Sequence, residues 1–445
     1  MSGREDLKAR VCAAIDAQAE RIVGLSDDVM RHPETGFREH ATARRVADQL
    51  RAMGLPFRDG LAGTGVKARL KGRSSRRTVA VLGELDSLLI SDHPFADPVT
   101  GAAHACGHNS MVASMIGAGL GLQAVLDDLD GDVVLFAVPA EECIELDWRL
   151  ARREAGDLEF VLGKAELIRL GEFEDVDLAV LTHASGAEDG PLATSRVTMN
   201  GSLIKRVRFR GRASHAGLAP WDGVNAFKAL ALASVGLDAQ RETFRDEDLV
   251  RVSSLVTKAG EAVSAIPAEA QMEMMIRART VPAMEDAAAK VDRALKAGAL
   301  VVGADVEIIT VTGYLPLVPD EPLVDLVDAN SRALLGDDKV LREGGHLGSS
   351  TDVGDLAHVL PVAHPMAASG NGAPFHSAGY YTSDHVLAAV NPAKFMAMTV
   401  VDLLADGAAG AERVVSESGP KLSRSEYVAL RRRLDQQTVF SSAHV

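Results

Sequence analysis

Three short apolar runs, separated by helical sequence, constrain most strongly how this chain can fold. Residues 78–83, 132–138 and 176–182 are rich in valine, leucine and alanine and carry few charges. Residues 110–126, which lie between the first two runs, have the apolar content and spacing of a helix. Buried strands that alternate with helices are typical of largely parallel sheets with covered faces. We therefore predict an α/β fold around a mostly parallel sheet.

Acidic side chains or a histidine follow each of these runs. Glu84 and Asp86 close the first run, Glu141 and Glu142 follow the second, and His183 follows the third. In open α/β sheets, ligands bind outside the carboxyl ends of the strands. These side chains are therefore candidates for one functional site.

The segment His-Ala-Cys-Gly-His-Asn at residues 104–109 adds a second cluster of reactive groups. Taken singly, each of its histidines and Cys106 is most simply a buried or satisfied residue in a turn. Together, Cys106 and His108 can turn toward one metal ion, and the glutamate pair supplies a further ligand and a proton acceptor. The combination favours a metal site for hydrolysis of a carbon–nitrogen bond.

Length and composition restrict the remaining choices. A chain of 445 residues exceeds what one hydrophobic core usually supports, so we expect two domains. The net charge of -15 argues against a nucleic acid or an anionic membrane as partner. The N-terminal sequence lacks the apolar core of a secretory signal, and the three cysteines show no pairing pattern. We expect a cytoplasmic protein.

The second domain is expected within residues 194–311, where strand and helix patterns follow one another as β-α-β-β-α-β. We predict an inserted α+β domain of ferredoxin-like topology there, with residues 1–193 and 312–445 forming the catalytic domain. Residues 4–53 are expected to form a helical pair, interrupted at 32–37. Residues 416–445 form a charged tail with modest helical period.

The motifs, taken in order, resemble metallopeptidase family 20 over about residues 20–410. The resemblance is to the branch with aminoacylases, auxin-conjugate hydrolases and aminobenzoyl-glutamate hydrolase. It rests on His-Pro-Glu-Thr-Gly-Phe at 32–37, Glu-Leu-Asp at 84–86, the 104–109 segment, Pro-Ala-Glu-Glu at 139–142, His183, Gly-Arg-Ala-Ser-His-Ala-Gly at 211–217, Pro-Trp-Asp-Gly-Val-Asn-Ala at 220–226, residues 350–355 and His376.

The resemblance implies a catalytic metallopeptidase-like domain and an inserted dimerisation or lid domain. It implies Glu141 as general base and five metal ligands, which normally hold two ions: Cys106, His108, Glu142, His183 and His376. We expect one or two divalent ions, manganese or zinc, with cobalt or nickel as alternatives.

The resemblance also implies a homodimer or higher homo-oligomer formed through the inserted domain. His215 would then reach a neighbouring subunit's site and stabilise negative charge on the substrate. Asn225 and Arg277 are weaker candidates for substrate contact from the same domain.

Two departures from the family pattern bear on the site. Glu84 stands where many members have histidine, and Asn109 stands where this branch commonly has aspartate. Residues 144–163 form an insertion that carries Trp148 and three arginines. The insertion either shapes the substrate pocket or forms an exposed charged helix.

The expected activity is hydrolysis, by metal-activated water, of the amide in an N-acyl or aryl-acyl amino acid. The alternative is an aryl-amine aminohydrolase of the nitroanthranilate type, in which water displaces an amino group from a ring. A catalytically silent binding protein is a remote third option, since it would have no need of Glu141. A thiol hydrolase using Cys106 and His108 leaves the glutamate pair without a role.

Overall fold

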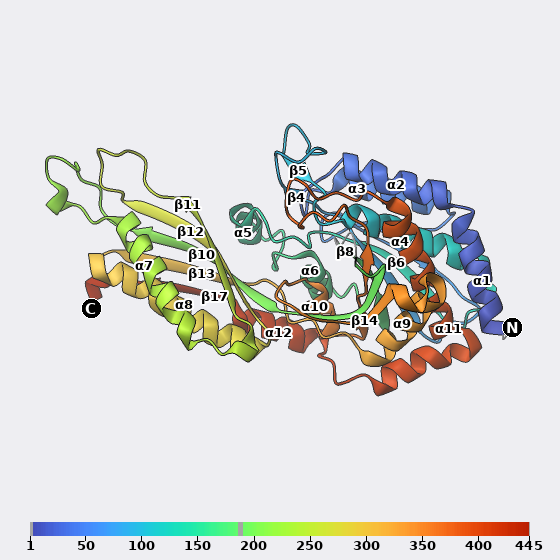
Figure 1. Cartoon of the computed structure of the whole chain (residues 1–445). Coiled ribbons are helices and arrows are strands. Elements are labelled where there is room, and N and C mark those ends of the chain that lie inside the picture. The colour runs from blue at the N-terminus through green and yellow to red at the C-terminus, as the bar shows by residue number, and fades with distance from the viewer. Residues whose placement is uncertain (1–2, 186–189, 445) are drawn as a thin grey trace. The chain divides into compact units, whose positions relative to one another are not determined.

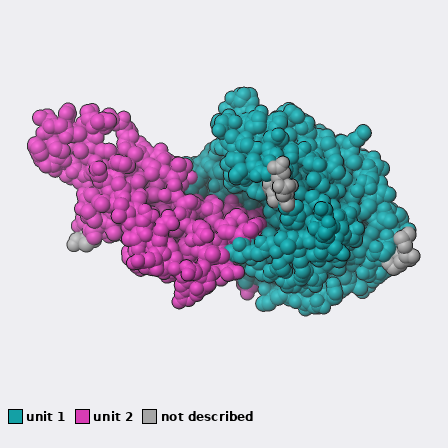
Figure 2. Space-filling view, viewed as in Figure 1, with its two compact units in different colours: residues 1–198, 318–346, 355–424 teal, residues 199–317, 347–354, 425–445 magenta. Residues whose placement is uncertain are grey.

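The computed structural model describes residues 3–185 and 190–444, and the chain divides into two compact units (Figure 2). Unit 1 comprises Met1–Thr198, Val318–His346 and Asp355–Arg424. Unit 2 comprises Met199–Leu317, Leu347–Gly354 and Ser425–Val445. In this division the inserted stretch is 199–317, compared with the expected 194–311. Residues 347–354 and 425–445, which we expected in the catalytic domain, also belong to unit 2.

A six-stranded sheet forms the centre of unit 1, and its parallel part confirms the predicted α/β class (Figure 1). Strand β6 pairs in parallel with β3, β3 with β7 and β7 with β15, whereas β1 and β2 extend the sheet antiparallel. In sheet order the strands are β1 (Phe57–Leu61), β2 (Gly65–Leu70), β6 (Asp132–Val138), β3 (Thr78–Glu84), β7 (Leu178–Val180) and β15 (Val362–Ala363).

Helices pack around this sheet and bury most of their apolar side chains. Helix α4 contacts β3 and β6 of the sheet as well as α1, α2 and α11, so it lies at the centre of the core. The helices of unit 1 include α1 (Gly3–Asp16), α2 (Ala19–Arg31), α3 (His40–Ala52), α4 (His108–Leu122), α5 (Leu146–Glu154), α6 (Gly163–Leu170), α9 (Glu321–Leu335) and α11 (Asn391–Glu417). Helix α10 (Val353–Ala357) begins in unit 2 and ends in unit 1.

The predicted N-terminal helical pair is wrong, because this region forms three helices. The first helix of the expected pair is interrupted at residues 17–18, between α1 and α2. There the backbone N–H of Gln18 donates to the carbonyl oxygen of Ile15, and Gln18 has non-helical backbone angles. The apolar spacing continues across that break, so periodicity alone gave no sign of it.

Two helical stretches, His108–Asp128 and Val386–Glu417, are long and apolar enough to cross a membrane by length and composition. In each, 78% of the apolar window is buried inside the protein. Burial of this extent is expected for helices that pack in a protein core.

Smaller sheets complete the elements around the candidate site. A four-stranded sheet has the order β14 (Val340–Leu347), β9 (Ala193–Met199), β16 (Met366–Ala368) and β8 (His183–Ser185). A two-stranded ribbon joins β4 (Leu88–Leu89) to β5 (Ala102–Ala103). The ribbon precedes the 104–109 segment, and β8 begins at His183, so both position candidate ligands.

Unit 2 contains the predicted β-α-β-β-α-β order with one further strand. Its antiparallel sheet runs β11 (Arg251–Lys258), β12 (Glu269–Ala278), β10 (Gly201–Arg210), β13 (Asp305–Thr312) and β17 (Gln436–Phe440). Helices α7 (Ala226–Gln240) and α8 (Val281–Val302) pack on it, and every second residue of β12 is buried. The tail, described above as charged with modest helical period, forms α12 (Arg424–Leu434) and then β17, which pairs with β13.

Candidate metal centre

The loop before α4 turns sharply at Gly107 and brings Cys106 and His108 to the same side. Gly107 has a φ of 85°, and a Cβ at this position would lie 2.5 Å from the Cβ of Ala184. Only glycine combines this left-handed backbone with so close an approach. The turn therefore places the loop directly against β8, which carries His183.

The five ligand residues implied by the resemblance lie together in unit 1 as two groups that share Cys106. Ligand atoms of Cys106, His108 and His183 lie within 4.8 Å of one another, as do those of Cys106, Glu142 and His376. Within these groups, Cys106 Sγ is 3.4 Å from His183 Nε2, and His376 Nε2 is 3.2 Å from Glu142 Oε1.

Asp86 orients two of these residues. The Nδ1 atom of His108 lies 2.9 Å from the backbone carbonyl oxygen of Asp86 and 3.3 Å from its Oδ1. The backbone N–H of Glu142 donates to Asp86 Oδ2 at 2.8 Å. A ligating histidine usually donates its second N–H to such a partner, so His108 presents Nε2 to the site.

Buried polar atoms at this centre indicate that the donor set fits a cation. Among the described residues, Glu84 Oε2, His108 Nε2 and Glu142 Oε1 are buried without a hydrogen bond of their own, and their near contacts are other ligand-type atoms: Glu84 Oε2 faces His108 Nε2, and Glu142 Oε1 faces His376 Nε2, each at 3.2 Å. Buried acceptors normally have a partner, and a group of them that meets at one place is the arrangement that a metal ion satisfies.

Electrostatics within the cluster favour the ligating forms of the thiol and the carboxylate. Burial and the Glu142 carboxylate raise the pKa of Cys106, but the imidazoles of His183 and His108 outweigh both and lower it to about 6. Burial also raises the pKa of Glu142, and the facing His376 imidazole lowers it to about 2. The thiolate and the carboxylate are the forms that bind metals.

Glu141, the residue predicted as general base, lies beside the ligands. It is 5% exposed, and one of its carboxylate oxygens lies within 4.8 Å of ligand atoms of His108 and Glu142. The preceding residue Ala140 has a φ of 51°, a left-handed conformation that is costly for a residue with a Cβ. The strained turn at the end of β6 directs both glutamates to the same cluster.

The three remaining predicted residues, His215, Asn225 and Arg277, belong to unit 2. His215 is exposed, and its Nδ1 accepts hydrogen bonds from the backbone N–H groups of Gly217 and Leu218. Asn225 caps the N-terminus of α7, with its Oδ1 accepting from the Lys228 N–H at 3.0 Å. Arg277 lies on β12, and its buried Nε has no partner among the described residues.

Sequence reasoning missed a buried lysine beside the ligands. Lys164 on α6 is 0% exposed and its Nζ donates to Glu84 Oε1 at 2.5 Å. Burial raises the pKa of Glu84, but Lys164 together with His108 and His183 lowers it to about 2. Lys164 lies 80 positions from Glu84, and no local motif connects the two residues.

The insertion at residues 144–163 contains the expected charged helix, and one of its arginines is buried against the backbone beside a candidate ligand. Its helix α5 exposes Arg152, whereas Arg149 is 0% exposed. Arg149 donates to the backbone carbonyl oxygens of Glu142 at 2.6 Å and Val161 at 2.7 Å. The helix is therefore charged on its outer face and fixed to a candidate ligand on its inner face.

An aromatic side chain also borders the cluster. The ring of Phe375 meets that of His183 edge-on at 5.7 Å between centroids and lies 4.5 Å from the ring of Tyr380. Phe375 is partly exposed, so it provides an apolar surface beside the candidate ligand His183. The low aromatic content of the sequence had given no indication of such a surface.

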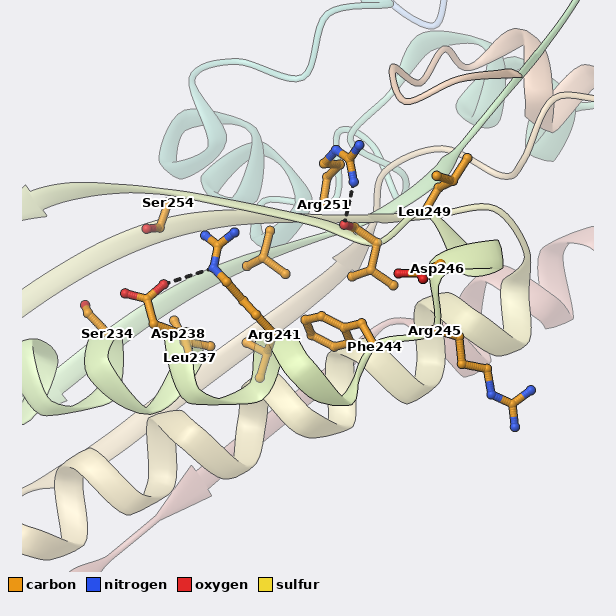
Figure 3. Close-up of a pocket in the computed structure, with 13 residues that line it drawn as sticks. Ser234, Leu237, Asp238, Arg241, Phe244, Arg245, Asp246, Leu249, Arg251 and Ser254 are labelled. Atoms are coloured by element: carbon orange, nitrogen blue, oxygen red, sulfur yellow. Dashed lines mark hydrogen bonds and ion pairs between the residues drawn. The ribbon is translucent and has the colours of Figure 1, made fainter. Parts of the chain in front are cut away.

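A separate cavity of about 610 Å³ lies in unit 2, where α7 and β11 supply part of its lining (Figure 3). Arg241 and Asp238 form an ion pair at 3.1 Å in its wall. None of the residues selected from the sequence lines this cavity.

Comparison with known proteins assigns the family. The model of peptidase family M20/M25/M40 matches residues 80–392. Over 428 residues the chain is 28% identical to the Xaa-Arg dipeptidase of Mus musculus, covering 90% of this chain and 89% of the relative. It is 31% identical to the N-acetylcysteine deacetylase of Bacillus subtilis over 267 residues, which is 58% of this chain and 65% of that protein.

A solved structure shares the fold. The crystal structure of a Bacillus subtilis protein, described as a dinuclear metal-binding peptidase of family M20, superposes with a TM-score of 0.62 at 21% identity. The match covers 87% of this chain and 99% of the other. The chain therefore belongs to peptidase family M20/M25/M40 and is a metal-dependent amidohydrolase.

Proposed function

We propose that this enzyme hydrolyses the amide bond that joins an acyl or aryl-acyl group to an amino acid. The observation that carries this proposal is the pair of ligand groups that share Cys106, with Glu141 beside them. One or two divalent ions bound there, manganese or zinc, would polarise the carbonyl and lower the pKa of a water molecule.

The residues of the chain take distinct roles in this proposal. Cys106, His108, Glu142, His183 and His376 hold the metal ions. Glu141 accepts a proton from the attacking water and then delivers it to the departing nitrogen. Asp86 holds His108 and Glu142 in place through the contacts described above.

Relatives and an aromatic wall support a small amide substrate. A dipeptidase and an N-acyl amino acid deacetylase both cleave an amide adjoining an amino acid, and these are the activities in the names of two relatives. Phe375 adds an apolar surface beside His183, which suits an alkyl or aryl part of the acyl group.

The proposed enzyme is a cytoplasmic homodimer. A homodimer through unit 2 would bring His215 to a neighbouring subunit's site, where it would stabilise charge on the substrate oxygen. The exposed position of His215 is compatible with such a role. Within the described residues, Cys12, Cys106 and Cys143 form no disulfide, which suits a reducing cytoplasm.

The test is a product assay with metal-reloaded enzyme on N-acyl amino acids, Xaa-Arg dipeptides, aryl amides and substituted anthranilates. Release of an amino acid from an amide, in proportion to metal content, is the expected result. Ammonia release from an anthranilate with no amide cleavage would replace the proposal with aromatic deamination.

A further inference from the structure

Glu84 carries a buried carboxylate oxygen, Oε2, at the candidate metal centre, and none of the proposed roles uses it. Glu84, at the end of β3, has one oxygen paired with Lys164. Its other oxygen, Oε2, lies 3.2 Å from His108 Nε2, and both side chains are 0% exposed. Neither atom makes a hydrogen bond within the described residues.

The chemistry of His108 makes this contact informative. Its Nδ1 faces two oxygens of Asp86, both of which are acceptors, so a ligating His108 carries its proton on Nδ1. The lone pair of Nε2 then points toward the lone pairs of Glu84 Oε2. Two acceptors that face one another in a buried site are unfavourable unless a proton or a metal ion lies between them, and in a ligating His108 it is the metal ion that takes this place.

The distance itself matches that of a ligand pair. Metal–nitrogen and metal–oxygen bonds of about 2.0–2.2 Å place neighbouring ligand atoms about 3 Å apart. The contact between Glu84 and His108, at 3.2 Å, equals that between Glu142 and His376 and is close to the 3.4 Å between Cys106 and His183. The spacing between Glu84 and His108 therefore falls in the range of the two pairs of proposed ligands, Glu142–His376 and Cys106–His183.

We propose that Glu84 Oε2 is an additional ligand of the ion that His108 binds, and that Lys164 is the residue that positions it. The ammonium of Lys164 binds the opposite oxygen, so it fixes the carboxylate plane without occupying the ligand atom. This inference rests on the proposed metal-dependent function. It makes one ion site richer in oxygen, which favours manganese relative to zinc.

The experiment measures metal affinity and cobalt spectra, not turnover. Full-length protein is stripped of metal and titrated with manganese, zinc and cobalt in competition with a chelator. The variants are Glu84→Gln, Lys164→Met and, as a matched control, Glu166→Gln. Glu166 is also a buried carboxylate, but it binds Arg169 and backbone N–H groups.

We expect Glu84→Gln to weaken manganese binding at least about tenfold, to affect zinc less, and to change the cobalt d–d absorption through the loss of a ligand. Lys164→Met should weaken binding to a smaller extent, and Glu166→Gln should bind as the wild type does. The double variant Glu84→Gln with Lys164→Met removes both buried charges together and covers the case in which the single variant does not fold.

Unchanged manganese affinity and cobalt spectra in folded Glu84→Gln, or in the double variant, would overturn the inference and leave the proposed function intact. Wild-type protein that binds none of the three metals would overturn both.

Discussion

At the scale of single residues, Glu141 and Glu142 are adjacent but have different proposed roles. Glu142 faces His376 and is a proposed ligand, so Glu142→Ala should lose bound metal. Glu141→Gln should keep its metal and lose turnover by about 10²–10⁴-fold, the usual contribution of a general base. Metal analysis and kcat on the two purified variants check this pair. Near-normal rates in Glu141→Gln would remove it from the reaction.

A second prediction concerns the pH dependence of stability. Glu39 is fully buried, and burial together with the nearby Asp86 carboxylate raises its pKa to about 8. Between about pH 5 and 8 the folded protein therefore holds a proton that the unfolded chain has released, so this stabilising contribution is lost as pH rises.

The isosteric variant Glu39→Gln isolates this effect. We expect the free energy of unfolding of the wild type to fall relative to the variant by up to about 1.4 kcal/mol per pH unit in this window. Denaturant unfolding at several pH values measures the difference. Two curves that stay parallel from pH 5 to 8 would contradict a protonated Glu39.

At the scale of elements, Arg149 joins the two ends of the insertion. It donates to the carbonyl oxygens of Glu142 and Val161 from a fully buried position. Arg149→Met would leave these acceptors without that donor, so we expect a loss of about 2–4 kcal/mol in unfolding free energy and weaker metal binding.

Arg152→Met on the same helix is the control for this prediction. Its side chain is 50% exposed and pairs with Asp157, so the change should stay within about 0.5 kcal/mol. Equal stability and metal content in both variants would show that α5 does not support the site.

Two of the three predicted apolar runs match buried strands closely, whereas the third, 176–182, is longer than the strand β7 (Leu178–Val180) within it. The run at 132–138 is β6 without any shift in its bounds, and 78–83 is β3 less its last residue. The β17 strand could not be predicted in this way, since Gln436–Phe440 is short, polar and largely exposed. Its pairing with β13 depends on a partner more than a hundred residues away.

At the candidate site too, residues in local motifs could be predicted from the sequence, whereas residues that depend on distant partners could not. Residues with ligand-type side chains in local motifs, such as Cys106 and His108, could be selected from the sequence, and the structure brings them together. Lys164 and Arg149 could not, because a buried cation looks like any surface charge until its partner is known. Their partners, Glu84 and the Glu142 carbonyl oxygen, are supplied by other elements or by backbone.

At the scale of the whole molecule, the proposed dimer predicts that two inactive variants restore activity to one another. A mixture of His215→Ala and Glu141→Gln chains forms mixed dimers in which one site has both wild-type groups, if His215 acts across subunits. Random pairing then gives about one quarter of the wild-type rate. The two variants are mixed so that their subunits exchange or refold together, and the rate of the mixture is compared with the rate of each variant alone. A mixture as inactive as its parts would place His215 outside the neighbouring site.

The most direct test of the central claim is turnover of an N-acyl amino acid by metal-depleted enzyme during stepwise return of manganese or zinc. We expect depletion to abolish amino acid release and activity to return in proportion to bound metal, reaching a plateau at one or two ions per chain. Undiminished hydrolysis by fully depleted protein would contradict it.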